Sequence, residues 1–202
     1  MIRSLSILIL ASLLAAADPL DDVRARFFYD GQPIHPGIIE LFSPWISDSE
    51  PLVLSVDLAK AQGSNQFFDT PKPQPSGWVE SPPKKDGSSF AYRFIGALPS
   101  GLLVLLIVES GGGSGQFESL MLFTVGIEQG WNDDGSRRTE HVLHVLRDIS
   151  LGDRADAVVT IASDRIHVTR SQSLPNELHD PLDIADPLLA TASGATAHPW
   201  HK

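Results

Sequence analysis

The pair Asp153–Arg154 is the pattern whose residue types point most directly to chemistry, because a carboxylate and a guanidinium stand together after Gly152. An aspartate in a turn caps neighbouring backbone N–H groups. An arginine pairs with a carboxylate through two parallel hydrogen bonds, and the same guanidinium is able to bind an anionic ligand. We favour the structural role and keep Asp153 and Arg154 as candidate ligand-binding residues.

The four tryptophans form a second group of candidates, because Trp45, Trp78, Trp131 and Trp200 all fall in or near expected loops. An exposed indole on a β surface can stack on a sugar ring. Its large apolar area also allows it to anchor a loop against the edge of a core, which is the interpretation we favour. Trp78 and Trp131 are taken as candidate ligand-binding residues.

The glycine run Gly111–Gly115 allows three functional interpretations and one structural one. A phosphate loop would end in Gly-Lys-Ser or Gly-Lys-Thr, which is missing here. A nucleophile elbow would need glycine two residues after Ser114, where Gln116 stands. An anion-binding nest of backbone N–H groups stays open. We favour a hairpin turn, since glycine supplies the positive φ that tight turns need.

Two further patterns resemble metal sites. In the zinc metalloprotease motif a glutamate follows the first histidine and the second histidine lies four residues on; here Glu140 precedes His141, and His144 follows three residues later. That spacing sends the rings to opposite faces of a strand, so we expect two histidines that are hydrogen-bonded separately. Asn132–Gly135 has oxygen ligands without the EF-hand spacing, and favours a hairpin loop. We predict no metal and no cofactor.

Composition limits the partners. The chain has 202 residues, of which 42% are hydrophobic, enough for one sizeable core. Its 15 Lys and Arg against 25 Asp and Glu give a net charge of -10, which disfavours nucleic acid and anionic membrane surfaces. The chain has 0 cysteines, which removes disulfides, thiolate metal sites and cysteine catalysis. We expect a small molecule, a glycan or a protein as partner, and no membrane insertion.

Residues 1–17 read as a secretory signal peptide. Arg3 supplies the positive start, Leu5–Leu14 is a short apolar run, and Ala15–Ala17 supplies small residues at the cleavage positions. The run is shorter than the roughly 20 apolar residues that cross a bilayer. A buried N-terminal helix is the alternative. We expect cleavage before Asp18 and a periplasmic or secreted protein.

The elements that must position these residues are mostly strands. Alternation of apolar and polar residues predicts strands over 23–29, 52–58 and 90–94, while the unbroken apolar run 102–108 predicts a central strand covered on both faces. The proline-rich stretch 69–88 predicts a long loop with room for one short strand. Further strands are expected over 117–127, 141–149, 158–161 and 166–169. Turn signals about 8–12 residues apart predict an all-β antiparallel meander, forming a β-sandwich or a partly open barrel.

The composition changes after Arg170. Residues 171–202 are rich in Pro, Ala, Ser, Thr and Asp and poor in large apolar side chains. We therefore expect a single β-rich domain over 18–170, followed by an extended or disordered tail over 171–202 that does not pack.

Short motifs in the second half resemble those of a loosely defined group of secreted bacterial proteins and lipoproteins. The motifs are Gly112-Gly113-Ser114-Gly115-Gln116-Phe117, Leu151-Gly152-Asp153-Arg154, Phe90-Ala91-Tyr92 with Pro99-Ser100-Gly101, and an Asp-Pro-containing tail. Several members of the group end in a cysteine-containing Asp-Pro tail, whereas His179-Asp180-Pro181 lacks the cysteines. The resemblance covers residues 88–170 and implies a secreted β domain with no particular chemistry.

Two functions of different classes follow. The first is an exported, non-catalytic binding or structural module. The second is a periplasmic or secreted hydrolase whose acid and base converge only in the fold; Asp57, Asp69, Glu109, Asp153 and the histidines are the available groups. A deep polar pocket holding two carboxylates, or a carboxylate and a histidine, would favour the enzyme, and an exposed tryptophan face would favour the binder.

Overall fold

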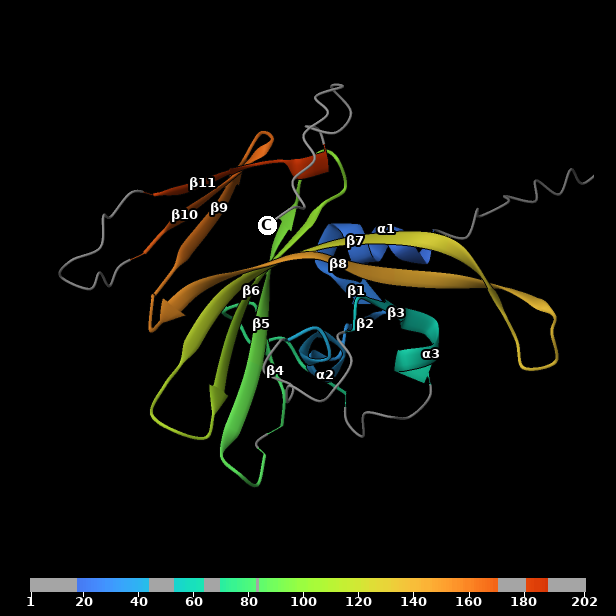
Figure 1. Cartoon of the computed structure of the whole chain (residues 1–202), viewed down its shortest axis with the longest axis horizontal. Coiled ribbons are helices and arrows are strands. Elements are labelled where there is room, and N and C mark those ends of the chain that lie inside the picture. Colours follow the sequence, from blue (N-terminus) through green and yellow to red (C-terminus); the bar gives the residue numbers. More distant parts are fainter. Residues whose placement is uncertain (1–17, 44–52, 64–69, 83, 171–180, 189–202) are drawn as a thin grey trace, which may run out of the picture.

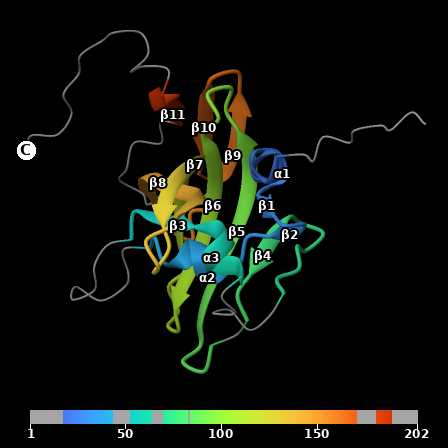
Figure 2. The same cartoon turned by 90° about the vertical axis from the view of Figure 1, so that its right-hand side faces the viewer.

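The described part of the chain is an all-β sandwich of antiparallel sheets with six, three and two strands and no closed barrel. The computed structural model describes residues 18–43, 53–63, 70–82, 84–170 and 181–188. Figure 1 shows the six-stranded sheet in the middle, with helices on one side and the three-stranded sheet on the other. Figure 2 looks at the same molecule from the helix side. The predicted fold class is confirmed.

The central sheet has the strand order β3-β8-β7-β6-β5-β4. Its strands are β3 (Ser55–Asp57), β4 (Trp78–Glu80), β5 (Ser88–Ala97), β6 (Leu103–Gly111), β7 (Phe117–Trp131) and β8 (Arg137–Asp153). Strands β4 to β8 follow one another along the chain and in the sheet, which is the predicted meander. Strand β4 is the short strand that was expected within the proline-rich stretch 69–88.

Strand β6 confirms the expectation of a strand covered on both faces. Leu103, Leu105 and Ile107 point into one hydrophobic core, and Val104 and Leu106 point into another. The helix-side core also holds Leu20, Val23, Phe27, Ile38, Phe90, Tyr92, Phe123 and Leu143. The strand-side core also holds Leu98, Leu102, Leu120, Leu122, Val159, Ile166 and Val168. The period-two alternation of strand side chains therefore builds two cores from one sheet.

Strands β7 and β8 form a long hairpin that leaves the sheet. Strand β6 pairs with β7 only from Phe117 to Phe123. Beyond that point the only partner of β7 in the described sheet is β8, up to the pair Trp131↔Arg137. Strand β8 also pairs with the short strand β3, at residues 142–144. Register shifts at Glu118/Ser119 and Leu122/Phe123 bend the hairpin. We call residues 124–141 the arm, and Figure 1 shows it extending past the helices.

The second layer is the sheet β11-β10-β9, made of β9 (Val158–Ala162), β10 (Arg165–Thr169) and β11 (Leu182–Ala185). Strand β11 corrects the expectation that nothing after residue 170 packs. It pairs with β10 from Arg165↔Ala185 to Val168↔Leu182, and Asp186 beside it is only 2% exposed. Leu182 and Ile184 pack against the strand-side core. The average composition of residues 171–202 hid this short apolar pair, which would have indicated the strand.

Three short helices cover the other face: α1 (Pro19–Arg26), α2 (Pro36–Glu40) and α3 (Leu58–Gly63). The strand predicted over 23–29 is wrong for most of its length. Asp18 caps α1 by accepting the Leu20 N–H at 2.9 Å, and Pro19 stands in its first turn, so these start signals outweigh the alternation. Only Phe28–Tyr29 is a strand, β1, which turns at Asp30–Gly31 into β2 (Gln32–Pro33).

The strand predicted over 52–58 is also shorter than expected. Strand β3 ends at Asp57, whose carboxylate accepts the Ala59 N–H at 3.1 Å and so starts helix α3. Residue 52 lies outside the described residues.

Candidate functional site

A groove of about 550 Å³ lies on the strand-side face of the central sheet. It crosses β4, β5, β6 and β7 toward the end of the sheet that Figure 1 shows away from β9–β11. Its main lining side chains are Trp78, Glu80, Ser81, Lys84, Gln116, Glu118 and Asp156. Together with the hydroxyls of Ser88 and Ser89, they place carboxylates, an amide, hydroxyls and one ammonium group around the Trp78 indole.

Trp78, one of the candidate residues from the sequence, lines this groove. It stands on the edge strand β4, opposite Arg93 of β5. The Arg93 guanidinium lies 5.2 Å from the centre of the indole, so one part of the ring is already fixed by a cation–π contact. The ring is half-buried against the strand-side core and also lines the groove. The packing agrees with the interpretation of Trp78 as an anchor, and the same ring also lines the groove.

Ser81 gives the groove a polar group without a partner. Its backbone N–H bonds the Phe90 carbonyl at 2.9 Å, whereas its hydroxyl oxygen is buried and makes no hydrogen bond within the described residues. A buried hydroxyl without a partner is unfavourable, so a group able to donate to or accept from it would gain by entering.

Glu118 organises the floor of the groove. Its carboxylate accepts the Asp156 N–H and the Ala157 N–H, each at 2.9 Å, and the residue is only 8% exposed. Asp156 lies in the left-handed region with φ 46, so these bonds hold a conformation that the backbone rarely adopts. The Glu118 side chain therefore fixes the segment after Arg154, and sequence reasoning missed it because its partners are backbone groups 38 residues or more away.

Asp153 and Arg154 lie beside the groove without lining it. The Asp153 carboxylate accepts the Gln116 N–H at 2.8 Å, and the Arg154 guanidinium contacts Asp153 at 3.2 Å and donates to the Ser114 carbonyl. The Arg154 N–H also bonds the Gln116 carbonyl at 2.7 Å. These bonds join the glycine hairpin to the end of β8. The two side chains are 41% and 49% exposed, so they form an ion pair at the surface, which we call the surface clasp.

The glycine run connects β6 to β7 as a hairpin. Only Gly112 of this run has a positive φ, 86°, and a Cβ added there would lie 2.4 Å from the Asp86 carbonyl oxygen. The glycine therefore serves both a turn and a close approach to the neighbouring loop, which is the structural interpretation that we favoured.

The two histidines of β8 behave as expected from a strand. His141 Nδ1 lies 2.7 Å from the Tyr29 hydroxyl, and His144 Nε2 lies 2.6 Å from the Glu128 carboxylate. They therefore have separate partners and share no ligand position. Within the described residues no three His, Asp or Glu side chains are arranged to hold a metal ion.

Trp131 and the loop after it lie at the tip of the arm. Trp131 is 63% exposed, with the Arg137 guanidinium 5.4 Å from its ring centre. In the loop, Asp134 accepts the Ser136 N–H at 2.9 Å, and Gly135 has φ 80, the geometry of a turn. Trp78 and Trp131 are thus in different places and do not form one face. Trp45 and Trp200 lie outside the described residues.

Glu109 and Asp148 form a second, acidic cluster on the helix side. Burial raises the pKa of both carboxyl groups, and the charge of Asp148 raises the pKa of Glu109 further. Ser43 donates to Glu109 at 2.9 Å, and Ser119 bonds Asp148. Glu109 was among the available acid and base groups, whereas Asp148 sits in an alternating strand and gave no signal. Asp69 lies outside the described residues.

These features define an antiparallel β-sandwich with a polar groove on one face. Comparison with known proteins adds no relative, since no family model, no curated protein and no solved structure matches this chain. Among the described helices, none is long and apolar enough to cross a membrane.

Proposed function

We propose that the protein is exported and works as a non-catalytic binding module, whose groove takes a neutral, hydroxyl-rich ligand such as an oligosaccharide. The observation that carries this proposal is the composition of the groove. An indole wall supplies apolar area for a sugar ring, and amide, carboxylate and hydroxyl groups around it supply hydrogen bonds.

The charge of the groove supports a neutral ligand over an anion. Lys84 is the only lysine among the described residues that line it, and it is paired with Glu40, whereas three carboxylates face the same space. Arg154, which we considered as an anion-binding residue, directs its guanidinium to Asp153 and to the hairpin backbone. An anionic ligand would therefore meet more negative than positive charge.

The start of the described part of the chain supports export. Asp18 is the capping residue of α1, and Leu20 and Val23 are fully buried just after it. Cleavage between Ala17 and Asp18 would therefore leave the cap and the core of the described part intact. The intact mass of protein recovered from the periplasm or the culture fluid tests this; a species that keeps Met1 would contradict it.

The binding proposal is tested by titrating neutral oligosaccharides and following tryptophan fluorescence and melting temperature. We expect saturable binding that raises the melting temperature, since a ligand of the native state stabilises it by mass action. Trp78→Ala should remove it and Trp131→Ala, on the arm, should not. Because Trp78 also packs against the core, Gln116→Ala is a second groove variant that spares the packing. Binding that depends on Trp131, or on neither variant of the groove, would overturn the proposal.

A hydrolase is the second candidate, and one observation favours it. Glu109 is partly buried and Asp148 is more exposed, and both carboxyl groups have raised pKa values, as a general acid requires. Activity against glycoside or ester substrates that disappears in both Glu109→Gln and Asp148→Asn would establish it. Activity that survives both variants would exclude this pair.

A further inference from the structure

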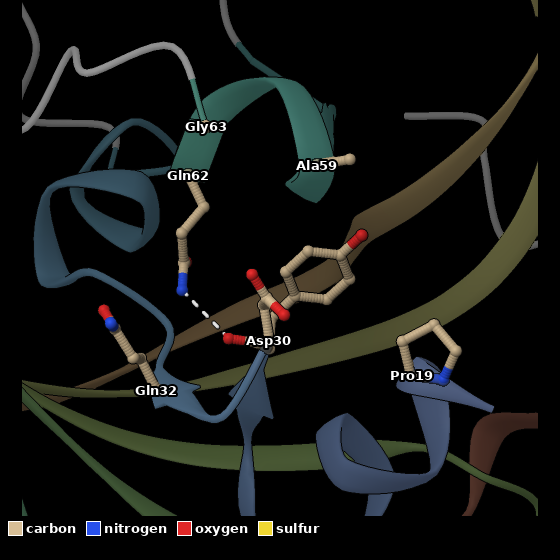
Figure 3. Close-up of a pocket in the computed structure, with 7 residues that line it drawn as sticks. Pro19, Asp30, Gln32, Ala59, Gln62 and Gly63 are labelled. Carbon is tan, nitrogen blue, oxygen red and sulfur yellow. Dashed lines mark hydrogen bonds between the residues drawn. The ribbon is translucent and has the colours of Figure 1, made fainter. Parts of the chain in front are cut away.

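A second pocket, of about 490 Å³, lies on the helix side of the molecule, away from the groove. Its wall is formed by the start of α1, the β1–β2 turn and helix α3, and includes Pro19, Tyr29, Asp30, Gln32, Ala59 and Gln62. Figure 3 shows Asp30 and Gln62 facing each other across this space, with Pro19 and Ala59 at its side. Three segments far apart in the sequence thus build one cavity.

Gln62 leaves an unused acceptor at this pocket. Its Nε2 donates to the Tyr29 carbonyl oxygen at 3.1 Å, which fixes the orientation of the amide (Figure 3). Its Oε1 is buried and accepts no hydrogen bond within the described residues. A buried acceptor without a donor is unfavourable, so this oxygen favours a ligand that brings N–H groups.

The charge of the pocket is negative. Burial raises the pKa of the Tyr29 hydroxyl, and the negative charges of Asp57 and Asp30 raise it further. Asp57 is paired with Arg138 at 3.5 Å, whereas the described residues place no lysine or arginine against Asp30. Pro19 adds apolar surface and has no N–H to offer. The wall is therefore rich in acceptors and carries one carboxylate that is not neutralised.

We propose that this pocket binds an aliphatic ammonium ion. The ammonium group would lie between the Asp30 carboxylate and the Gln62 Oε1, which together supply charge and a neutral acceptor. The carbon chain would lie against Pro19, Ala59 and the Tyr29 ring, which supply apolar surface. The site is independent of the groove, because it lies on the opposite face of the central sheet.

The test compares three probes of similar size and different charge: n-butylamine, n-butanol and butyrate. We expect n-butylamine at neutral pH to raise the melting temperature in a saturable way at millimolar concentration, and the other two to have no effect. Added salt should weaken the effect, because Asp30 is exposed and its charge is screened. Equal stabilisation by n-butanol, or no saturable effect of n-butylamine, would overturn the proposal.

Two variants separate the pocket from the general acidity of the chain. Asp30→Asn should weaken n-butylamine binding at least tenfold; Asn tolerates the left-handed φ of 51 found there, so the variant keeps the turn. Asp133→Asn removes the same charge from the exposed loop of the arm and should leave binding unchanged. An equal loss in both variants would show that n-butylamine responds to net charge alone, and would overturn the proposal.

Discussion

The two faces of the central sheet are covered in different ways, and the difference explains where the groove lies. On the helix side, α1, α2 and the β1–β2 turn bring large side chains such as Phe27 and Phe42 over the sheet. On the strand side, β9–β11 cover only part of the face, and the uncovered part carries the groove. The helix-side face is covered by apolar packing. On the strand-side face, the Glu118 carboxylate beside the groove is held by hydrogen bonds to two backbone N–H groups.

The largest effect expected from this comparison is a loss of helix-side packing. Phe123 is fully buried, with its ring centre 5.2 Å from that of Phe42 and 6.3 Å from that of Phe27. Phe123→Ala should lower the free energy of unfolding by about 3–5 kcal/mol. Urea denaturation measures this, with Trp131→Ala as an exposed aromatic control that should cost about 0.5 kcal/mol or less. Equal losses in the two variants would contradict the comparison.

The next effect concerns the hydrogen bonds of the strand side. Glu118→Ala removes the acceptor of two backbone N–H groups and should lower the free energy of unfolding by about 2–3 kcal/mol. Glu118→Gln keeps one acceptor oxygen and should lose less. Both are measured by urea denaturation. If the two variants lose the same amount, the hydrogen bond that glutamine retains contributes nothing to stability.

Strand β11 tests how firmly the second layer is held. Ile184 packs at the margin of the strand-side core, so Ile184→Ala should lower the free energy of unfolding by about 1–2 kcal/mol, less than a fully buried site. Val158→Ala on β9 removes a side chain that is mostly exposed and is the matched control. An Ile184→Ala protein as stable as the parent would show that β11 does not pack in solution.

The acidic cluster should show an effect of opposite sign. The folded pKa of Glu109 lies above its ordinary value, so the folded protein binds the proton more tightly than the unfolded chain. Stability should therefore fall as the pH rises from the ordinary carboxyl pKa through the raised one. Glu109→Gln should raise the free energy of unfolding at pH 7 by up to about 1 kcal/mol and change little at low pH. Melting temperatures at both pH values check this, and destabilisation at pH 7 would contradict it.

The smallest effect is expected for the surface clasp. Arg154→Ala removes an ion pair between two half-exposed side chains and should cost only about 0.5 kcal/mol. The Asp153→Ala/Arg154→Ala double variant should lose less than the sum of the single losses, since neighbours that share a bond are coupled. Thermal denaturation measures all three variants. A loss as large as that of Glu118→Ala would show that the clasp is buried in solution.

The sequence predicted the meander well, because its information is local. Alternation along β5, the continuous apolar run of β6 and the turn at Gly111–Gly115 each report on neighbouring residues, and neighbouring strands pair in this sheet. The helices were missed because α2 and α3 are too short to show a helical period, and in α1 a cap outweighs an alternating pattern. Capping signals at Asp18 and Asp57 were present in the sequence and predict both starts.

The candidate site was less predictable. Trp78 was a candidate from the sequence and lines the groove, where it meets residues of β7 and of the segment after β8. The roles of Glu118 and Ser81 depend on backbone groups that only the fold brings near. The opposite outcome holds for Asp153 and Arg154, whose local pairing was predicted while their exposure was not. Residue types in the sequence indicate which chemistry is available, and the fold determines which side chains lie close enough to carry it out.

The order of the strands also bears on how the chain folds. Strands β4 to β8 join through successive hairpins, so their pairing closes short loops, and such contacts form early because they cost little chain entropy. Strand β3 pairs with β8 across most of the domain, at Val56↔Leu143, and β11 joins β10 across a long connection. We expect the meander to form the folding nucleus, with β3 and β11 joining afterwards, so that damage to these outer strands speeds unfolding more than it slows folding.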